Sequence, residues 1–108
     1  MLDADHIYHE VTTAGEDWAD KKAAYETLDD LTKTVLANVL TDFLPPTCPT
    51  RAEAETRALA STAYKEHLAA VSRARKAWLL GEVKYKGLIM LAELRRTQES
   101  TRRQEMRV

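Results

Sequence analysis

The segment DWADKKAAYETL (residues 17–28) has a counterpart sixty positions later, AWLLGEVKYKGL (residues 77–88). Both place a tryptophan, a tyrosine seven residues on and a leucine three residues after that: Trp18, Tyr25 and Leu28, then Trp78, Tyr85 and Leu88. Only 6% of the chain is aromatic, so the repeated spacing is informative. Large apolar side chains at a seven-residue step share one side of an α-helix, as in a coiled coil. The two segments therefore predict two helices, each with one apolar face.

The first long helix is expected over residues 3–44. Its apolar row, which we call a seam because it would face a second helix, consists of Val11, Trp18, Tyr25, Leu28, Val35 and Val39. Gaps of seven, three and four residues fit a coiled-coil seam better than the alternation of a strand. Lys21 and Thr32 would also occupy the seam, and Gly15 marks a point where the helix is expected to fray or to begin.

A turn is expected at PPTCPT (residues 45–50), since proline lacks a backbone donor and clashes with the preceding helical turn. Thr50 and Glu53 have the spacing of a capping box, which predicts a short helix over residues 51–60. Ser61 and Thr62 offer a second cap, so a bend is expected there, although a continuous helix stays open.

A second long helix is expected over residues 62–105. Steps of four and three residues define its predicted seam: Tyr64, Leu68, Val71, Arg75, Trp78, Glu82, Tyr85, Ile89 and Ala92. Gly81 and Gly87 flank Tyr85, which suggests that a neighbouring helix approaches closely at that point.

These elements predict a single domain, residues 1–108, with an all-α fold. It is an antiparallel long-helix hairpin, coiled-coil-like, with a short helix after the proline-rich turn. The expected anchors of the seam are Trp18, Tyr25, Leu28, Val35, Tyr64, Leu68, Val71, Trp78, Tyr85 and Ile89. A three-helix bundle and a fold that depends on dimerisation are the alternatives.

Composition bounds the class of protein. A charged fraction of 31% beside a hydrophobic fraction of 44% suits a folded helical chain. One cysteine excludes a disulfide within the chain and favours a reducing compartment, and the acidic start MLDADHIYHE does not resemble a secretory signal. No apolar run is long enough to span a membrane, so no membrane association is expected.

Catalytic and metal-binding patterns are weak. His6, His9 and Glu10 share one helical turn but have no second cluster to complete a metal site. His67 is expected at the surface, beside the seam, and Cys48 lacks a basic neighbour that would activate its thiol. We therefore expect no enzyme, no metal, no cofactor and no small-molecule substrate.

Charge is divided between the two halves of the chain. Residues 1–44 contain ten acidic residues and three lysines, a net charge of −7, and residues 45–108 carry +6. Five arginines near the C-terminus are the one feature that suggests a ligand: Arg95, Arg96, Arg102, Arg103 and Arg107. They suit a weak contact with nucleic acid or an acidic protein partner. The glutamates between them also fit an ordinary solvated helix end.

Three stretches resemble a set of small helical accessory proteins of tailed bacteriophages and prophages: AAYETLDDLTKTVLA (residues 23–37), RALASTAYKEHL (57–68) and VKYKGLIMLAELRRTQESTRRQEM (83–106). The proline pair at residues 45–46 departs from the polar loop expected in such proteins. The resemblance implies a viral protein of the host cytoplasm that acts by binding, near DNA recombination and single-strand DNA machinery. An inhibitor of a host defence or host enzyme and a structural coiled-coil oligomerisation module are the alternatives.

A homo-oligomer is expected as well, with a protein partner. Both long helices have apolar residues outside a single seam, which widen the apolar face beyond what one helix covers: Leu31, Leu36, Leu40, Phe43, Leu79, Leu80 and Leu91.

Overall fold

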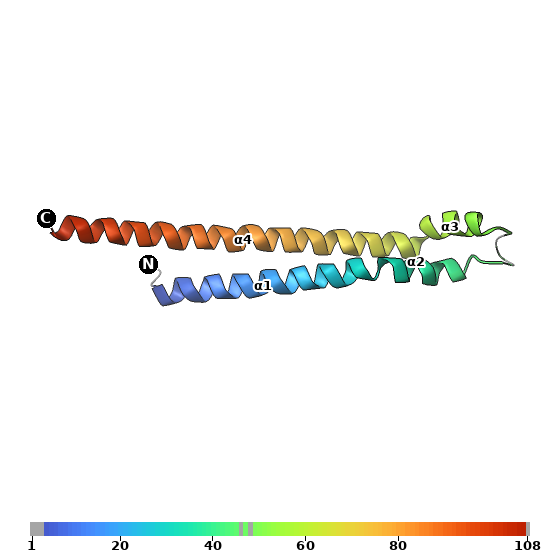
Figure 1. The fold of residues 1–108 in the computed structure, drawn as a ribbon, viewed down its shortest axis with the longest axis horizontal. Coiled ribbons are helices and arrows are strands. Elements are labelled where there is room, and N and C mark those ends of the chain that lie inside the picture. The colour runs from blue at the N-terminus through green and yellow to red at the C-terminus, as the bar shows by residue number, and fades with distance from the viewer. Residues whose placement is uncertain (1–3, 46, 48, 108) are drawn as a thin grey trace. The chain divides into compact units, whose positions relative to one another are not determined.

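The computed structural model describes residues 4–45, 47 and 49–107, and within them every regular element is a helix. Helix α1 spans Ala4–Asp30, α2 Thr32–Thr41, α3 Arg51–Leu59 and α4 Thr62–Arg107 (Figure 1). The predicted class, an all-α antiparallel long-helix hairpin with a short helix after the turn, is confirmed. The chain divides into two compact units, residues 1–20 with 78–108 and residues 21–77.

The first long helix differs from the expectation in one place. Instead of one helix over residues 3–44, the structure has α1 and α2 with Leu31 between them. The Leu31 N–H still donates to the Thr27 carbonyl at 3.2 Å, and the Leu31 carbonyl accepts from Val35 at 2.9 Å. The backbone therefore stays nearly helical through the interruption. Of the predicted turn, Pro46 and Cys48 lie outside the described residues.

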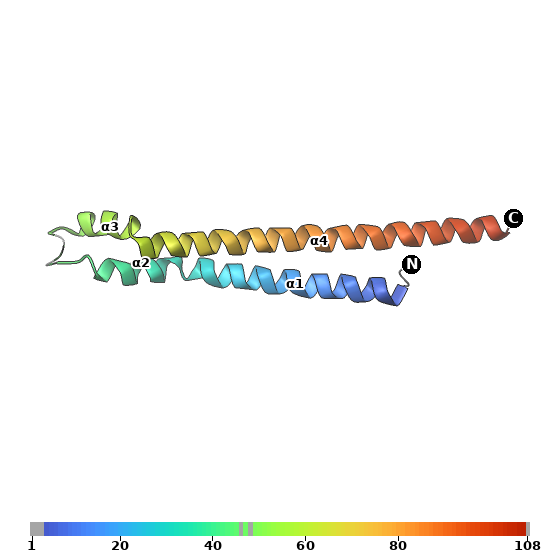
Figure 2. The ribbon, with the colours of Figure 1, turned by 180° about the vertical axis from the view of Figure 1, so that it is seen from behind.

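In the first unit, the start of α1 runs antiparallel to the C-terminal part of α4 (Figures 1 and 2). The rings of Trp18 and Tyr85 stack with centroids 5.2 Å apart and planes inclined by 28°. Gly15 lies against the same tyrosine, because a Cβ added to it would be 2.9 Å from Tyr85 Cε1. The absent side chain of Gly15 thus makes room for the stacked ring.

One sequence-based expectation about glycine is therefore wrong, and another, a close helix approach at Tyr85, is confirmed for Gly81 but not for Gly87. Helix α1 neither begins nor ends at Gly15 but passes through it. Gly87, expected at a close helix approach, has open space where a Cβ would stand, whereas Gly81 is buried. The close contact with Tyr85 comes from the glycine of the opposite helix.

In the second unit, α2 packs against α3. Ala54 and Ala58 of α3 are completely buried, and Val39 of α2 is 9% exposed. The small alanines, one helical turn apart, let the short helix approach closely enough to bury apolar surface.

Two hydroxyl caps set the ends of the helices in this unit. Thr50 Oγ1 accepts from the Glu53 N–H at 3.2 Å at the start of α3, which is the hydroxyl half of the predicted capping box, while the Glu53 carboxylate contacts Arg57. Ser61 Oγ accepts from the Tyr64 N–H at 3.2 Å and donates to the Ala58 carbonyl at 2.7 Å. One serine therefore both closes α3 and starts α4, and the expected bend is present.

At every second position, the buried row of α4 lies one residue before the predicted seam. Leu68 is 43% exposed and Arg75 is also exposed, so both predicted seam positions are wrong. Burial instead follows steps of three and four through Tyr64, His67, Val71, Ala74, Trp78, Gly81, Tyr85, Leu88, Ala92 and Arg95. Glu82 and the predicted anchor Ile89 are half-buried at the edge of this row.

Space between the helices explains the displacement. Large side chains at Trp78 and Tyr85 alternate with small ones at Ala74 and Gly81. A large ring needs a small neighbour if two helices are to pack closely, so the small residues occupy the intervening seam positions.

Candidate functional site

Helix α4 continues past the first described residue of α1 in the first unit. Ala4 of α1 and Glu99 of α4 line the same groove, and every described residue from Ser100 to Arg107 is exposed. Figure 1 shows this last stretch of α4 without a neighbouring helix. Its surface is therefore open to a ligand.

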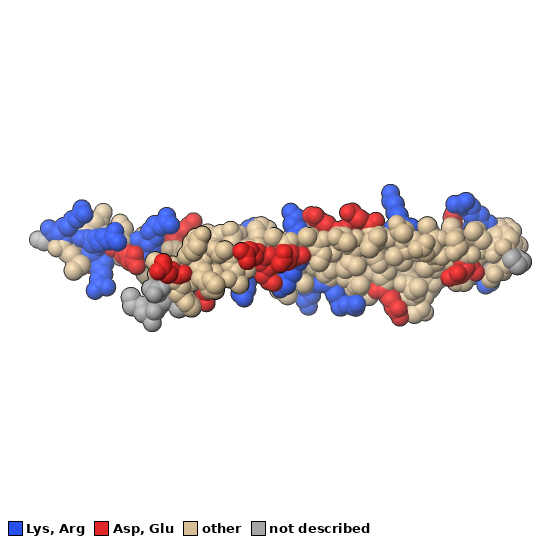
Figure 3. Space-filling model, turned by 90° about the horizontal axis from the view of Figure 1, so that it is seen from below, with Lys and Arg blue, Asp and Glu red and all other residues tan. Residues whose placement is uncertain are grey.

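The five C-terminal arginines gather on one side of that stretch. At 100° per residue they fall within an arc of about 140°, turned to the same side of the helix as the seam. We call this set the arginine face: Arg95, Arg96, Arg102, Arg103 and Arg107. Basic side chains crowd this end of α4 in Figure 3.

Acidic residues occupy only a small part of the arginine face. Glu99 lies inside the arc, whereas Glu93 and Glu105 project near or beyond its two edges. Arg95 is half-buried and the other four arginines are exposed. Folding therefore gathers positive charge that the linear sequence shows interspersed with glutamates.

Beside this face, the start of α1 and α4 enclose a groove of about 470 Å³. We call it the end groove. Its lining combines apolar side chains with a polar rim: Ala4, Ile7, Tyr8, Val11, Ile89, Ala92, Glu93, Arg95, Arg96 and Glu99. The groove thus brings an apolar surface and a phenol ring next to two arginines.

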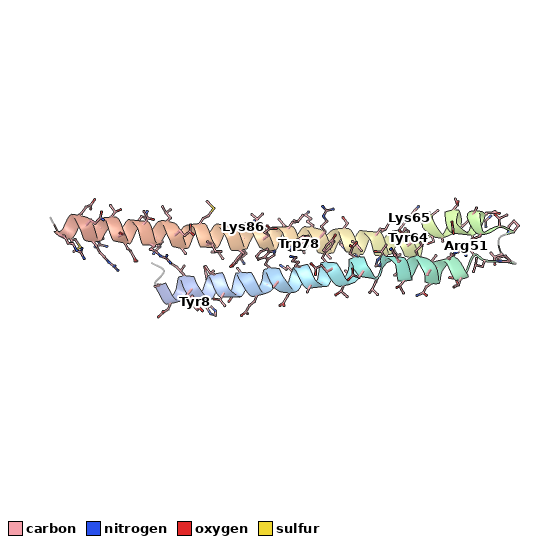
Figure 4. The ribbon with its side chains drawn as sticks, viewed as in Figure 1. Tyr8, Arg51, Tyr64, Lys65, Trp78 and Lys86 are labelled. Atoms are coloured by element: carbon pink, nitrogen blue, oxygen red, sulfur yellow. The ribbon has the colours of Figure 1, made fainter. Side chains whose placement is uncertain are left out.

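Sequence reasoning missed Tyr8 as a site residue. It is 74% exposed, an unusual position for a large aromatic ring, and lies at the start of α1 (Figure 4). The hairpin prediction itself held the signal, since antiparallel helices bring the first turns of one beside the last turns of the other. The aromatic ring nearest two of the arginines in the groove therefore comes from the other end of the chain.

The remaining predicted anchors are half-buried: Trp18, Tyr25, Leu28, Val35, Tyr64, Val71, Trp78 and Tyr85. The indole N–H of Trp18 is buried and has no hydrogen-bond partner among the described residues. A buried donor without a partner lowers stability, so the stabilising contribution of Trp18 comes from the packing of its ring.

His67 corrects another expectation. It lies in the seam instead of beside it, half-buried, with Nε2 3.0 Å from Thr32 Oγ1 in the second unit. Thr32, already expected in the seam of the first helix, was the available signal, because a hydroxyl in the seam needs a polar partner on the facing helix. The pair joins α2 to α4 within the second unit.

At the start of α1, His6 Nε2 is 3.2 Å from Glu10 Oε1, an exposed contact of one helical turn. Over the described ranges, no three His, Cys, Asp or Glu side chains come together as metal ligands would. Cys48 falls outside those ranges.

The helices of the described residues include none with both the length and the apolar character of a membrane span. Comparisons of the chain with protein families, with curated proteins and with solved structures find no match.

Proposed function

We propose that the protein is a non-enzymatic accessory protein that acts by binding, and that its arginine face takes the backbone of single-stranded DNA. The observation that carries the proposal is the clustering of five arginines on one side of a helix end that has no neighbouring helix among the described residues of its own unit. The resemblance of three sequence stretches to phage accessory proteins supports a role for this binding near recombination and single-strand DNA machinery in an infected host cell.

The chemistry of arginine supports a phosphate ligand. A guanidinium stays charged and offers its N–H groups in a planar fork, which matches two phosphate oxygens. Arg95 and Arg102 are separated by two helical turns, about 10 Å, as are Arg96 and Arg103. Two parallel pairs can therefore hold a flexible strand at several phosphates.

The end groove supports a single strand over a duplex. Tyr8 stands at its rim with Arg95 and Arg96, so a base turned away from the backbone can stack on the phenol ring. In a duplex the bases already stack on one another and are not available for that contact. Binding is expected to be weak, because the interface is small and Glu99 lies among the arginines.

The proposal is tested by titrating a labelled oligothymidylate with the full chain and following its fluorescence anisotropy at several salt concentrations. Three to five phosphate contacts predict a slope of log affinity against log salt of about −2 to −3.5. Replacing Arg102 and Arg103 by glutamine should lower the affinity and make the slope shallower by about 1.4.

The matched control replaces Arg73 and Arg75 by glutamine. Both arginines are also exposed on α4, and their replacement removes the same charge, but they lie in the other unit. The control should bind as the wild type does. Equal losses in the two double variants, or no binding of DNA by the wild type at low salt, would overturn the proposal.

A further inference from the structure

Helix α4 has a second apolar row on the side opposite its seam. In the first unit this outer row follows steps of three and four residues: Leu80, Val83, Gly87, Met90 and Leu94. The four side chains are 59%, 69%, 69% and 54% exposed, and the space beside Gly87 is open. A heptad spacing on an exposed face is the pattern of a helix that packs against another helix.

Charged residues border both edges of the outer row, and one edge carries two of opposite sign. Lys86 and Glu93 are one heptad apart and lie along this edge, whereas Lys84 and Leu91 lie along the other. Lys86 projects from α4 and is 64% exposed while its Nζ contacts Glu82 Oε1 at 2.7 Å (Figure 4). The edge therefore presents one positive and one negative charge. Two copies of this edge in antiparallel orientation can place opposite charges together.

We infer that the outer row binds the same row of a second copy of the chain, with the two α4 helices antiparallel. In the register that places Val83 opposite Leu94 of the partner copy, Gly87 comes opposite Met90. The open space beside the glycine then receives the long, flexible methionine side chain. Two-fold symmetry makes each of these contacts twice.

Charge selects this register over its neighbours. Here Lys86 faces Glu93 of the second copy, and Glu93 faces its Lys86. A shift of one heptad in one direction places the two Lys86 side chains together, and a shift in the other direction places the two Glu93 side chains together. Like charges at such positions disfavour both shifts.

A parallel arrangement lacks this complementarity. It would bring Lys86 beside Leu91 and Glu93 beside Gln98 of the second copy, with no opposite charge in either pair. In the antiparallel register Leu80 faces Thr97 of the second copy at each end of the contact. The contact covers about 27 Å of helix, a short interface, so association at micromolar concentrations is expected.

Sedimentation velocity across a micromolar concentration range, with charge variants of the full chain, tests the inference. The wild type should convert from monomer to dimer as its concentration rises. Lys86→Glu and Glu93→Lys should each weaken the dimer by tenfold or more, because each brings like charges together. An equimolar mixture of the two variants should recover the dimer, since each supplies the charge that the other needs.

Lys84→Glu is the matched control, because it makes the same charge change on the other edge of the outer row, where it would face Leu91 of the second copy. It should leave the dimer unchanged, and circular dichroism should show equal helix content in all variants. A wild type that stays monomeric, a mixture that does not recover the dimer, or equal effects at Lys84 and Lys86 would each overturn the inference. The outer row and the arginine face lie on different sides of α4, so this result and that of the DNA titration are independent.

Discussion

Two glycines of the first unit have opposite surroundings, which makes them a matched pair for a test of packing. Alanine favours a helix over glycine by about 1 kcal/mol wherever its methyl group has room. Gly87→Ala has that room in the single chain and should raise the free energy of unfolding by up to about 1 kcal/mol at protein concentrations below those of dimer formation.

Gly15→Ala should instead lower it by about 1 kcal/mol. Its methyl group would stand 2.9 Å from Tyr85 Cε1 and displace a ring that stacks on Trp18. Such overpacking typically costs about 1–3 kcal/mol, more than the helix preference returns. Urea unfolding followed by circular dichroism measures both values, and equal stabilisation by the two substitutions would contradict the contact.

Tyr8 provides a prediction about affinity. Loss of a stacked base weakens single-strand binding by about 1–3 kcal/mol, so Tyr8→Ala should reduce the affinity for oligothymidylate at least fivefold. The side chain is 74% exposed, and the thermal melt should therefore stay the same. Tyr8→Phe keeps the ring and should bind like the wild type. Anisotropy titrations compare the three proteins, and unaltered binding by the alanine variant would remove Tyr8 from the site.

At the scale of the helices, one hydroxyl joins the end of α3 to the start of α4. Ser61→Ala removes the acceptor for the Tyr64 N–H and the donor to the Ala58 carbonyl. Loss of a helix cap costs about 0.5–2 kcal/mol. Ser72→Ala, on an exposed site inside α4, should be neutral or slightly stabilising. Thermal melts distinguish the two, and equal midpoints would contradict the capping role.

The helices also show how far the sequence determines the packing. On α1, large residues at Val11, Trp18 and Tyr25 repeat at seven residues, and the repeat alone predicts which face is half-buried. On α4, the exposed Leu68 follows the half-buried His67, and apolar character favours the wrong one. The outcome depends on Thr32, which lies in another helix and accepts or donates the hydrogen bond of the histidine.

Part of the end groove could have been predicted from the sequence. The helix expected over residues 62–105 already places four of the five arginines on one side, and an antiparallel hairpin brings the first turns of α1 beside the last turns of α4. Tyr8 joins them through packing between segments that are far apart in the chain. Local patterns therefore predict the elements, and contacts between elements decide the site.

At the scale of the whole chain, stability and binding should be separable. Residues 100–107 are exposed throughout and include three of the five arginines. A chain that ends at Glu99 should keep the thermal midpoint of the full protein within about 2 °C, because little packing is lost. Its affinity for single-stranded DNA should fall at least tenfold by the same charge argument. A large drop in the midpoint would show that these last turns stabilise the fold.

The exposed end of α4 has a practical consequence. Trypsin cuts after arginine, so the side chains proposed to hold a ligand are also the residues that the protease recognises. Brief digestion should trim this end first, and a bound strand should slow the trimming in proportion to occupancy. Digestion with trypsin followed by mass spectrometry can therefore map a strand bound to this end of α4 without any label.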